Sequence, residues 1–215
     1  LMAVLETRDL GLRAGQRQLI ERLDWTVQEG EFWCVLGRNG AGKSSLLHVV
    51  SGLRAADRGE VRIAGQLLAD LAPPALARLR GLMPQQLVDS FSCTVFDAAA
   101  IGRTPWRIGR GWDDADDARR VDEALAAVGM EARKEDDLLQ LSGGERQRIA
   151  FAALLVQDPA LMLFDEPTAH QDIAQQLLLM RLMQRLSAHH AVVASCHDLN
   201  LAARFATHVL LLGDG

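Results

Sequence analysis

A glycine-rich run near the N-terminal end has the residue types that hold phosphate groups. It comprises Gly37, Arg38, Asn39, Gly40, Ala41, Gly42, Lys43 and Ser44, and fits the pattern GxxxxGK[ST]. Glycines let successive backbone N–H groups converge on phosphate oxygens, and the N-terminus of a following helix adds a favourable dipole. Lys43 would reach the β- and γ-phosphates of a nucleotide, and the hydroxyl of Ser44 would bind Mg²⁺. We therefore predict phosphate binding along residues 37–45, with Ser45 among the contacts.

Two adjacent carboxylates follow an apolar run later in the chain. Residues 161–164 are typical of a buried strand, and Asp165 and Glu166 come directly after it. Parallel α/β sheets bind their ligands beyond the carboxyl ends of the strands. Asp165 would hold Mg²⁺ directly or through water, and Glu166 would polarise the attacking water as a general base. A solvent-exposed acidic turn is the alternative interpretation, and the phosphate loop favours the metal site.

The elements that must position these residues change character along the chain. Short β-rich runs at 4–10, 25–27, 32–36 and 61–63 alternate with turns at 29–31 and 57–59. The spacing then predicts helices at 97–101 and 115–128, with Asp113 as a cap, Gly129 as a stop and a surface loop over 102–117. After residue 141, helices at 145–156, 173–186 and 199–205 alternate with apolar runs at 161–164, 192–195 and 209–212. This alternation predicts an α/β fold with a parallel sheet.

The segment Leu141-Ser142-Gly143-Gly144-Glu145 resembles the LSGGQ signature of ABC-transporter ATPases, and the order of all the motifs agrees with that family. The resemblance covers nearly the whole chain. It implies a P-loop NTPase core of mixed, mainly parallel sheet, with an N-terminal antiparallel β part and an inserted α-helical subdomain. We expect residues 1–86 and 158–215 to form the ATP-binding core and residues 87–157 the helical subdomain. A short C-terminal piece is expected to follow the last apolar run.

The resemblance also implies how the site works. Two copies would pair head to tail, and each ATP with its Mg²⁺ would lie between one phosphate loop and the partner's Ser142, Gly143 and Gly144. On the residues alone, this segment starts a helix and presents bare N–H groups to an anion, with a simple helix cap as the alternative.

Three further positions carry over from the family. Gln85 resembles the Q-loop glutamine that touches Mg²⁺ and the attacking water, although the adjacent Gln86 leaves the register open by one residue. His197 resembles the switch histidine that contacts the γ-phosphate, and Asp172 the D-loop aspartate that crosses the dimer interface. A surface glutamine and a structural histidine are the alternatives.

Two departures from the family pattern stand out. The D-loop has His170 and Gln171 where many relatives have Ala and Leu, which puts the contacts across the interface in doubt. Ala14 occupies the usual position of the aromatic residue that stacks on adenine, and the chain contains no tyrosine. Adenine would then be held weakly, or by the guanidinium of Arg13 or Arg17, so we expect relaxed base selectivity.

The composition of the chain limits the classes of protein to which it can belong. The chain has 215 residues, 49% of them apolar, which excludes a disordered chain. A net charge of -5 without a basic stripe argues against a nucleic-acid partner. Cys34, Cys93 and Cys196 are too far apart for a CxxC site and are expected to be buried cytosolic thiols. Neither a signal peptide nor a run of about 20 apolar residues is present, so we expect a soluble chain.

A second resemblance, over shorter segments, indicates which group of ABC-transporter ATPases the chain is most similar to. Residues 91–97, 102–105 and 197–202 are similar to ATPases that serve cobalamin, haem and ferric-siderophore importers. This implies integral membrane permease subunits as partners, a periplasmic binding protein acting indirectly, and a peripheral position at the cytoplasmic face of the cell membrane. An ATPase of another ABC system, exporters included, and a soluble nucleotide-dependent regulator remain the alternatives.

Overall fold

The computed structural model describes residues 3–85, 92–106, 115–169 and 171–213. Its strands are β1 (Ala3–Ala14), β2 (Arg17–Gln28), β3 (Phe32–Gly37), β4 (Arg58–Ile63), β5 (Gln66–Leu67), β6 (Arg80–Met83), β7 (Leu161–Phe164), β8 (Ala191–Ser195) and β9 (His208–Leu212). They form an antiparallel sheet of order β2-β1-β4-β5 and a parallel sheet of order β6-β7-β8-β3-β9.

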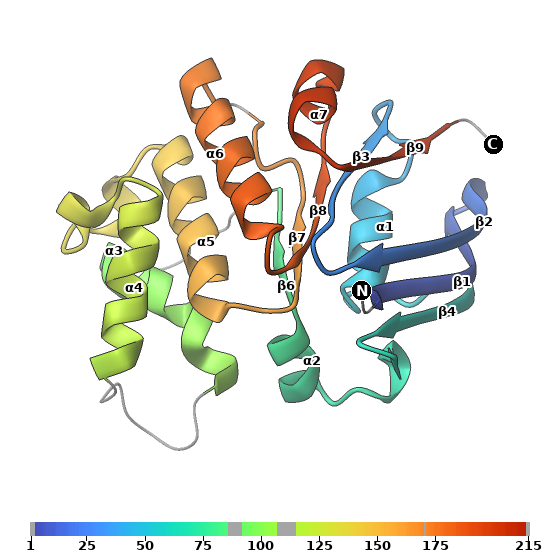
Figure 1. Cartoon of the computed structure of the whole chain (residues 1–215), viewed down its shortest axis with the longest axis horizontal. Helices are drawn as coiled ribbons and strands as arrows, with labels where there is room; N and C mark the ends of the chain where they lie inside the picture. The colour runs from blue at the N-terminus through green and yellow to red at the C-terminus, as the bar shows by residue number, and fades with distance from the viewer. Residues whose placement is uncertain (1–2, 86–91, 107–114, 170, 214–215) are drawn as a thin grey trace.

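The helices are α1 (Lys43–Val50), α2 (Pro73–Leu79), α3 (Val95–Ala100), α4 (Ala115–Ala127), α5 (Gly143–Gln157), α6 (Ile173–Leu186) and α7 (Leu199–Phe205). Short 3₁₀ segments are η1 (Leu68–Asp70), η2 (Ile101–Trp106), η3 (Glu131–Arg133) and η4 (Leu138–Gln140). Figure 1 shows the antiparallel sheet at one end of the molecule, the group of α3, α4 and α5 at the other, and the parallel sheet between them. The predicted architecture is confirmed, with the parallel and antiparallel strands in separate sheets.

The antiparallel strands are longer than the short runs that the sequence predicts. β1 and β2 pair along most of their length, and the two residues between Ala14 and Arg17 close the hairpin, with Gly15 at φ 59°. The predicted turn at 57–59 is wrong for its last two residues, because Arg58 pairs with Gly11 at the start of β4. Gly59 makes this possible with a φ of 81°, since a side chain there would collide with the backbone of Asp9.

The parallel sheet is buried on both faces. Phe32, Cys34 and Leu36 of β3 belong to one core cluster, and Val35 belongs to the other, as the two-residue period of a strand requires. α5 and α6 cover the first face, and α1 with the antiparallel sheet covers the second. Burial on both faces explains why these strands appear in the sequence as continuous apolar runs.

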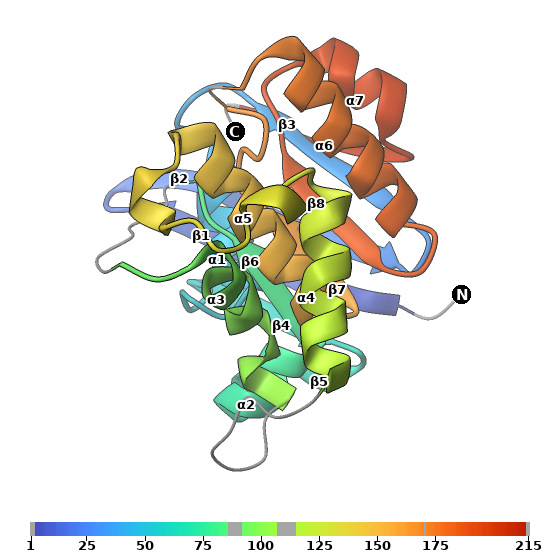
Figure 2. The same cartoon turned by 90° about the vertical axis from the view of Figure 1, so that its left-hand side faces the viewer.

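The helical part packs closely on the rest of the chain. Figure 2 shows α3, α4 and α5 gathered in front of the parallel sheet, and these three helices contact one another. The predicted loop over 102–117 is wrong at both ends, because η2 runs to Trp106 and α4 begins at Ala115. Gly102 allows η2 to approach α5, since a Cβ there would lie 2.0 Å from the carbonyl oxygen of Ala153. Gly129 ends α4 with a φ of 67°, as predicted, whereas Asp113 lies outside the described residues.

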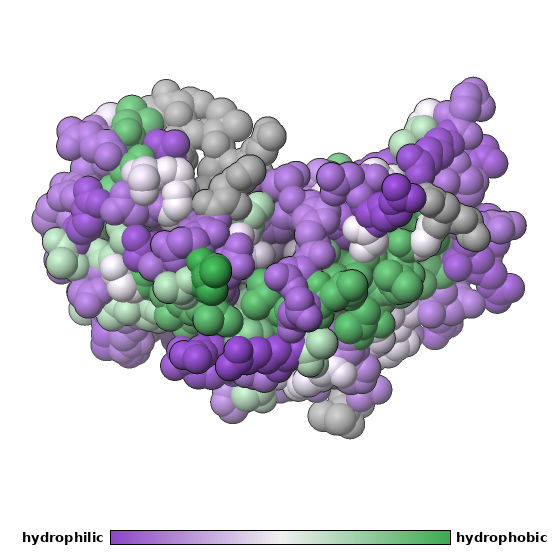
Figure 3. All heavy atoms as spheres, turned by 90° about the horizontal axis from the view of Figure 1, so that it is seen from above, coloured by the Kyte–Doolittle hydropathy of each residue, from purple (hydrophilic) through white to green (hydrophobic). Residues whose placement is uncertain are grey.

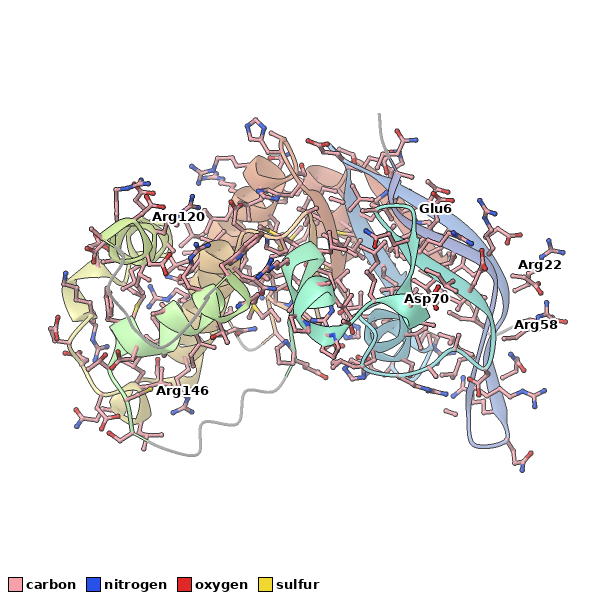
Figure 4. All side chains as sticks on the ribbon, turned by 90° about the horizontal axis from the view of Figure 1, so that it is seen from below. Glu6, Arg22, Arg58, Asp70, Arg120 and Arg146 are labelled. Carbon is pink, nitrogen blue, oxygen red and sulfur yellow. The ribbon has the colours of Figure 1, made fainter. Side chains whose placement is uncertain are left out.

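The surface is mainly polar. Figure 3 shows hydrophilic side chains over much of the upper face, with apolar ones gathered in a band across its middle. Figure 4 shows Arg22 and Arg58 together beside the antiparallel sheet and Arg120 and Arg146 at the helical end. Arg22 and Arg58 both pair with Asp9, and exposed pairs of this kind add little stability. Within the described ranges, no helix combines the length and the apolar character needed to cross a membrane.

Candidate functional site

The glycine-rich run lies between the end of β3 and the start of α1, as its sequence predicts. Gly42 is the N-cap of α1 with a φ of 101°, and a Cβ on it would lie 3.1 Å from Leu19 of β2. Lys43 is 5% exposed, and its ammonium donates to the carbonyl oxygens of Gly37 at 3.0 Å and Arg38 at 3.3 Å. The loop therefore holds the lysine head group beside the N-terminus of a helix, where an anion is favoured.

A cavity of about 790 Å³ opens over this loop. Its walls come from the hairpin of β1 and β2, from the loop, and from the segments that follow β6, β7 and β8. The lining residues are Ala14, Leu19, Asn39, Gly40, Gly42, Lys43, Ser44, Ser45, Gln85, Glu166, Ala169 and His197. The carboxyl ends of neighbouring parallel strands thus bring together residues that lie far apart in the sequence.

Asp165 is buried directly behind the loop, with 2% of its surface exposed. Its Oδ1 accepts hydrogen bonds from the hydroxyls of Ser44 at 3.1 Å and Ser195 at 2.7 Å. A carboxylate beside a serine hydroxyl offers the oxygen ligands that Mg²⁺ prefers, and the open cavity leaves room for the waters that this ion keeps. The donor set therefore fits a magnesium ion.

Glu166 lies at the centre of a polar cluster. Its Oε2 accepts from the side-chain amide of Gln85 at 2.6 Å, and its Oε1 lies 2.5 Å from Nε2 of His197. On the other side of the imidazole, Nδ1 lies 3.5 Å from the ammonium of Lys43, which can only donate. The neutral histidine therefore accepts at Nδ1 and donates from Nε2 to Glu166. Glu166 also has a φ of 50°, a strained conformation of the kind that clusters at functional sites.

Two residues of this cluster were missed by sequence reasoning. The hydroxyl of Ser195, besides donating to Asp165, accepts a hydrogen bond of 2.7 Å from the backbone N–H of Glu166. Gln147 of α5 donates to the carbonyl oxygen of Pro167 at 2.8 Å and so links the helical part to the same turn. Ser195 could have been found from the sequence, because it ends an apolar run just before His197. No feature of the sequence pointed to Gln147.

The signature segment lies apart from this cavity and starts α5. Ser142 is the N-cap, and its side chain and that of Glu145 form a capping box. Arg133 pairs with the other carboxylate oxygen of Glu145 and so offsets its charge at the helix N-terminus. Gly143, which is exposed, and the half-buried Gly144 form the first turn, so the segment starts a helix as predicted and also caps it as the alternative predicts. None of these residues is among the described ones that line the cavity.

Asp172 caps α6 and accepts from the backbone N–H of Gln175 at 2.9 Å. Gln171 donates to Gln147 at 2.5 Å, whereas His170 and Gln86 lie outside the described residues. The structure therefore gives Asp172 a local role within its own chain, and its expected contact across a dimer stays a prediction.

The end of the cavity away from the carboxylates is small and aliphatic. Ala14 and Leu19 line it, and no Phe, Tyr or Trp occurs among the described lining residues. The guanidinium of Arg13 donates to Gln18 at 2.8 Å. Nη1 of Arg17 lies beside the loop, 3.6 Å from where a Cβ on Gly40 would stand. Of the two arginines considered from the sequence, Arg17 is thus the one shown beside the phosphate loop.

Comparison with known proteins agrees with this geometry. The family model described as "ABC transporter" matches residues 20–169. The hemin import ATP-binding protein HmuV of Thermobifida fusca is 39% identical over 99% of this chain and 74% of its own length. An uncharacterized ABC transporter ATP-binding protein of Bacillus subtilis, YvrA, is 36% identical over 94% of this chain, which spans only 46% of that relative.

Among solved structures, the dimeric ABC transporter cassette MJ0796 superposes with a TM-score of 0.84. It is 26% identical, and the match covers 98% of this chain and 95% of the cassette. The site and these matches lead to one conclusion: the chain belongs to the ABC transporter family, as an ATP-binding subunit with the ATPase fold.

Proposed function

We propose that this chain hydrolyses ATP to drive a bacterial importer of a metal chelate such as haem, cobalamin or a ferric siderophore. The observation that carries the hydrolytic part is that Lys43, Glu166 and His197 line one cavity over the phosphate loop. Asp165 lies directly behind it and accepts a hydrogen bond from Ser44, which also lines the cavity. These groups combine a cation for phosphate, a metal-binding carboxylate and a general base. The similarity to a hemin import subunit supports the choice of cargo.

Each group of residues at the cavity has a different role in hydrolysis. Backbone N–H groups of residues 37–45 and the ammonium of Lys43 bind the β- and γ-phosphates of the substrate. Ser44, Asp165 and Gln85 would hold Mg²⁺, which would supply positive charge beside the phosphate oxygens. Glu166 takes a proton from the attacking water, while Gln85 and His197 hold its carboxylate in place. To donate to the γ-phosphate, His197 would exchange the hydrogen bond from its N–H to Glu166 for one to the phosphate when ATP binds.

We further propose that the site is completed by a second copy. In a head-to-tail pair, the segment of Ser142, Gly143 and Gly144 binds the γ-phosphate of the partner's ATP through the backbone N–H groups of the two glycines, since the N–H of Ser142 donates to Glu145. Asp172 lies at the same contact. The exposed first turn of α5 supports this, because it presents N–H groups that lie outside the chain's own cavity. ATP then favours the closed pair by binding both chains, and hydrolysis removes the shared phosphate.

A groove between the helical part and the core suits a membrane subunit as the partner. It has a volume of about 490 Å³, and Leu82, Met83 and Pro84 line one side while Ile101 and Pro105 line another. The first three residues run directly into Gln85, which donates to Glu166. A permease helix seated here would therefore sense the state of the hydrolytic carboxylate. This placement makes the chain peripheral at the cytoplasmic face of the membrane, with a periplasmic binding protein as an indirect partner.

The test of hydrolysis is the variant Glu166→Gln. An amide keeps the size of the side chain and cannot accept the proton, so we expect turnover to fall by about 10²-fold or more while ATP binding is retained. Steady-state phosphate release and binding of a fluorescent ATP analogue measure the two effects. Lys43→Ala is the matched control, and it should lose binding itself. Near-normal hydrolysis by Glu166→Gln would place the general base elsewhere.

The proposed cargo needs a separate test, because no residue of this chain touches it. A strain in which the chain's gene is deleted should lose uptake of haem, cobalamin or a ferric siderophore, and the wild-type gene should restore it. The Glu166→Gln gene is the control and should fail to do so. Normal uptake of all three chelates by the deletion strain would exclude these cargoes and leave the ATPase assignment standing.

A further inference from the structure

Three arginines that the proposed hydrolysis does not use surround one pocket between α6 and α7. Arg181 and Arg185 lie one turn apart on α6, and Arg204 lies in the last turn of α7. The pocket has a volume of about 570 Å³. Gln184 and Phe205 complete its described lining, so none of the described residues that line it is acidic. Positive charge is therefore concentrated at this pocket, which we call the arginine pocket.

The three guanidinium groups form no ion pair within the described part of the chain. The sequence explains this, because Asp198 is the only acidic residue between Ile173 and Gly213, and it is engaged as the N-cap of α7. On α4, by contrast, Arg119 and Arg120 both pair with Asp116. The arginine pocket is thus a site of unbalanced positive charge in a chain whose net charge is -5.

Helix stability alone does not explain this arrangement. A cation in the last turn of a helix interacts favourably with the helix dipole, and Arg185 and Arg204 lie in such turns. Arg181 lies a full turn earlier in α6, where this interaction has faded. It also stands four residues before Arg185, and like charges at this spacing destabilise a helix. An anion bound between them would replace this repulsion with attraction.

Contacts between the two helices keep the arginines around the pocket. The side-chain amide of Gln184 donates to the carbonyl oxygen of Phe205 at 3.3 Å and so joins the end of α7 to α6. The side chain of Phe205 is buried in the core, and the guanidinium of Arg204 lies over its ring, 5.4 Å from the centroid. Planar guanidinium groups bind phosphate oxygens through pairs of parallel hydrogen bonds, which an ammonium group cannot form.

We propose that the arginine pocket binds a small soluble molecule through its phosphate group. The volume of the pocket is within the range of about 300–1,000 Å³ that is typical of small-molecule sites. Such sites are mostly apolar, whereas this one is lined mainly by charged side chains, so the phosphate group supplies the recognition. The pocket shares no described residue with the cavity over the phosphate loop, so it is a second and separate anion site.

A phospholipid headgroup has the same chemistry, and the position of the pocket favours a soluble molecule instead. This choice of source rests on the proposed function. The groove assigned to the membrane subunit includes Ala77 of α2, and Figures 1 and 2 show α2 near the lower edge of the molecule and α6 and α7 at the upper edge. A membrane on the side of the groove therefore lies away from the arginine pocket.

Calorimetric titration of the Lys43→Ala chain with inorganic pyrophosphate tests the pocket, because the phosphate loop of this variant is disabled. We expect one pyrophosphate to bind per chain. Adding Arg181→Lys and Arg204→Lys should weaken binding by about tenfold or more, since lysine keeps the charge and loses the parallel hydrogen bonds. Arg22→Lys with Arg58→Lys, at the antiparallel sheet, is the matched control and should leave the affinity unchanged.

Three outcomes of this titration would overturn the proposal. They are the absence of binding, an affinity that the changes at Arg181 and Arg204 leave unchanged, and equal weakening by the control pair. The last would show that pyrophosphate responds only to the general charge of the surface.

Vesicles of phosphatidylcholine with phosphatidylglycerol test the lipid source. Here Arg181 and Arg204 are replaced by glutamine, because lysine would keep the attraction to an anionic surface. We expect the wild type and this variant to sediment with the vesicles to the same small extent. Vesicle binding by the wild type that the variant loses would assign the pocket to a lipid headgroup and overturn the soluble source.

The binding test is independent of the proposed hydrolysis. Pyrophosphate binding is measured in a Lys43→Ala chain, which needs no turnover. With Lys43 restored, the variant with lysine at 181 and 204 should hydrolyse ATP at the wild-type rate, because neither arginine lines the cavity over the phosphate loop. Absence of hydrolysis in the wild type would therefore count against the proposed function and leave the arginine pocket to be decided by the titration.

Discussion

Ser195 couples the two carboxylates of the site through one hydroxyl. It donates to Asp165 and accepts from the backbone of Glu166, whose φ of 50° leaves that turn strained. In Ser195→Ala, Asp165 loses a hydrogen bond and the Glu166 N–H is left unpaired, so we expect kcat to fall by about tenfold or more and the Mg²⁺ concentration for half-maximal activity to rise. Magnesium titrations of ATPase activity measure both effects.

Ser51→Ala is the matched control for that variant. Ser51 is equally buried, and its hydroxyl donates to the carbonyl oxygen of His48 at 3.0 Å, away from the carboxylates. Ser51→Ala should lose about 1 kcal/mol of stability, the usual net value of one hydrogen bond, and Ser195→Ala about 1–3 kcal/mol, because it also leaves the Glu166 N–H unpaired. Only Ser195→Ala should change the magnesium dependence. If both variants changed it equally, Ser195 would have only a structural role.

We expect the nucleobase to meet few specific groups at the aliphatic end of the cavity. Ala14 and Leu19 offer no hydrogen bond and no ring face, so we expect kcat/KM for GTP to lie within a few-fold of that for ATP. Ala14→Tyr adds a stacking surface, and base stacking on an aromatic ring contributes about 1–3 kcal/mol, so ATP should bind about tenfold more tightly. Ala14→Leu is the aliphatic control. A strong preference of the wild type for ATP would contradict the expectation.

At the scale of elements, the N-terminus of α5 depends on Glu145. Its pKa is lowered first by the hydrogen bond from the backbone N–H of Ser142, then by the Ser142 hydroxyl and Arg133. A lowered carboxylate pKa means that this stabilisation is full above the ordinary value of 4.5 and is lost as pH falls through the lowered value. We expect Glu145→Gln to keep the capping box and Glu145→Ala to cost about 1 kcal/mol.

Urea unfolding of the two Glu145 variants measures this difference. At pH 7 Glu145→Ala should unfold at lower urea than Glu145→Gln, and the wild type should lose the charge-dependent part of its advantage over Glu145→Ala as the pH is lowered toward 3. Equal stability of all three proteins at pH 7 would mean that Arg133 and the helix dipole, rather than the capping box, hold this turn.

The sequence predicted the elements that have strong local signals. β7, α6 and α7 begin and end where their apolar periodicity does, and the phosphate loop lies between a strand and a helix as its motif requires. α2 was missed because its first two residues are prolines, which are typical of loops as well as of a first helical turn. Gly59 was assigned to a turn because glycine is typical of turns. In the structure its φ above zero serves the irregular pairing of β1 with β4 instead.

The residues of the candidate site likewise fall into those that the sequence could predict and those that it could not. Residues within the phosphate loop and beside the ends of strands could be placed from motif and order alone. The contacts of Ser195 with Asp165 and Glu166, and of Gln147 with Pro167, join segments that meet only when the parallel sheet is complete. Such tertiary contacts have no periodicity in the sequence, so only the fold could reveal them.

For the whole molecule, the decisive feature is that the cavity over the phosphate loop and the N-terminus of α5 lie in different places. The cavity over the phosphate loop lies at the carboxyl ends of the parallel strands, and the exposed N-terminus of α5 belongs to the helical part. A γ-phosphate held in the cavity therefore contacts the signature segment only if a second copy supplies it. From this separation we predict dimerisation that depends on ATP.

Sedimentation velocity of Glu166→Gln with and without ATP and Mg²⁺ tests that dependence, because this variant holds ATP without consuming it. We expect a monomer without nucleotide and a dimer with it, since each γ-phosphate then binds two chains. Adding Ser142→Arg should abolish the dimer while ATP still binds, because a bulky side chain blocks the partner's phosphate at the start of α5. Lys43→Ala should stay monomeric because it binds no ATP. A Glu166→Gln protein that binds ATP and remains a monomer would contradict the shared site and leave Ser142 as a helix cap.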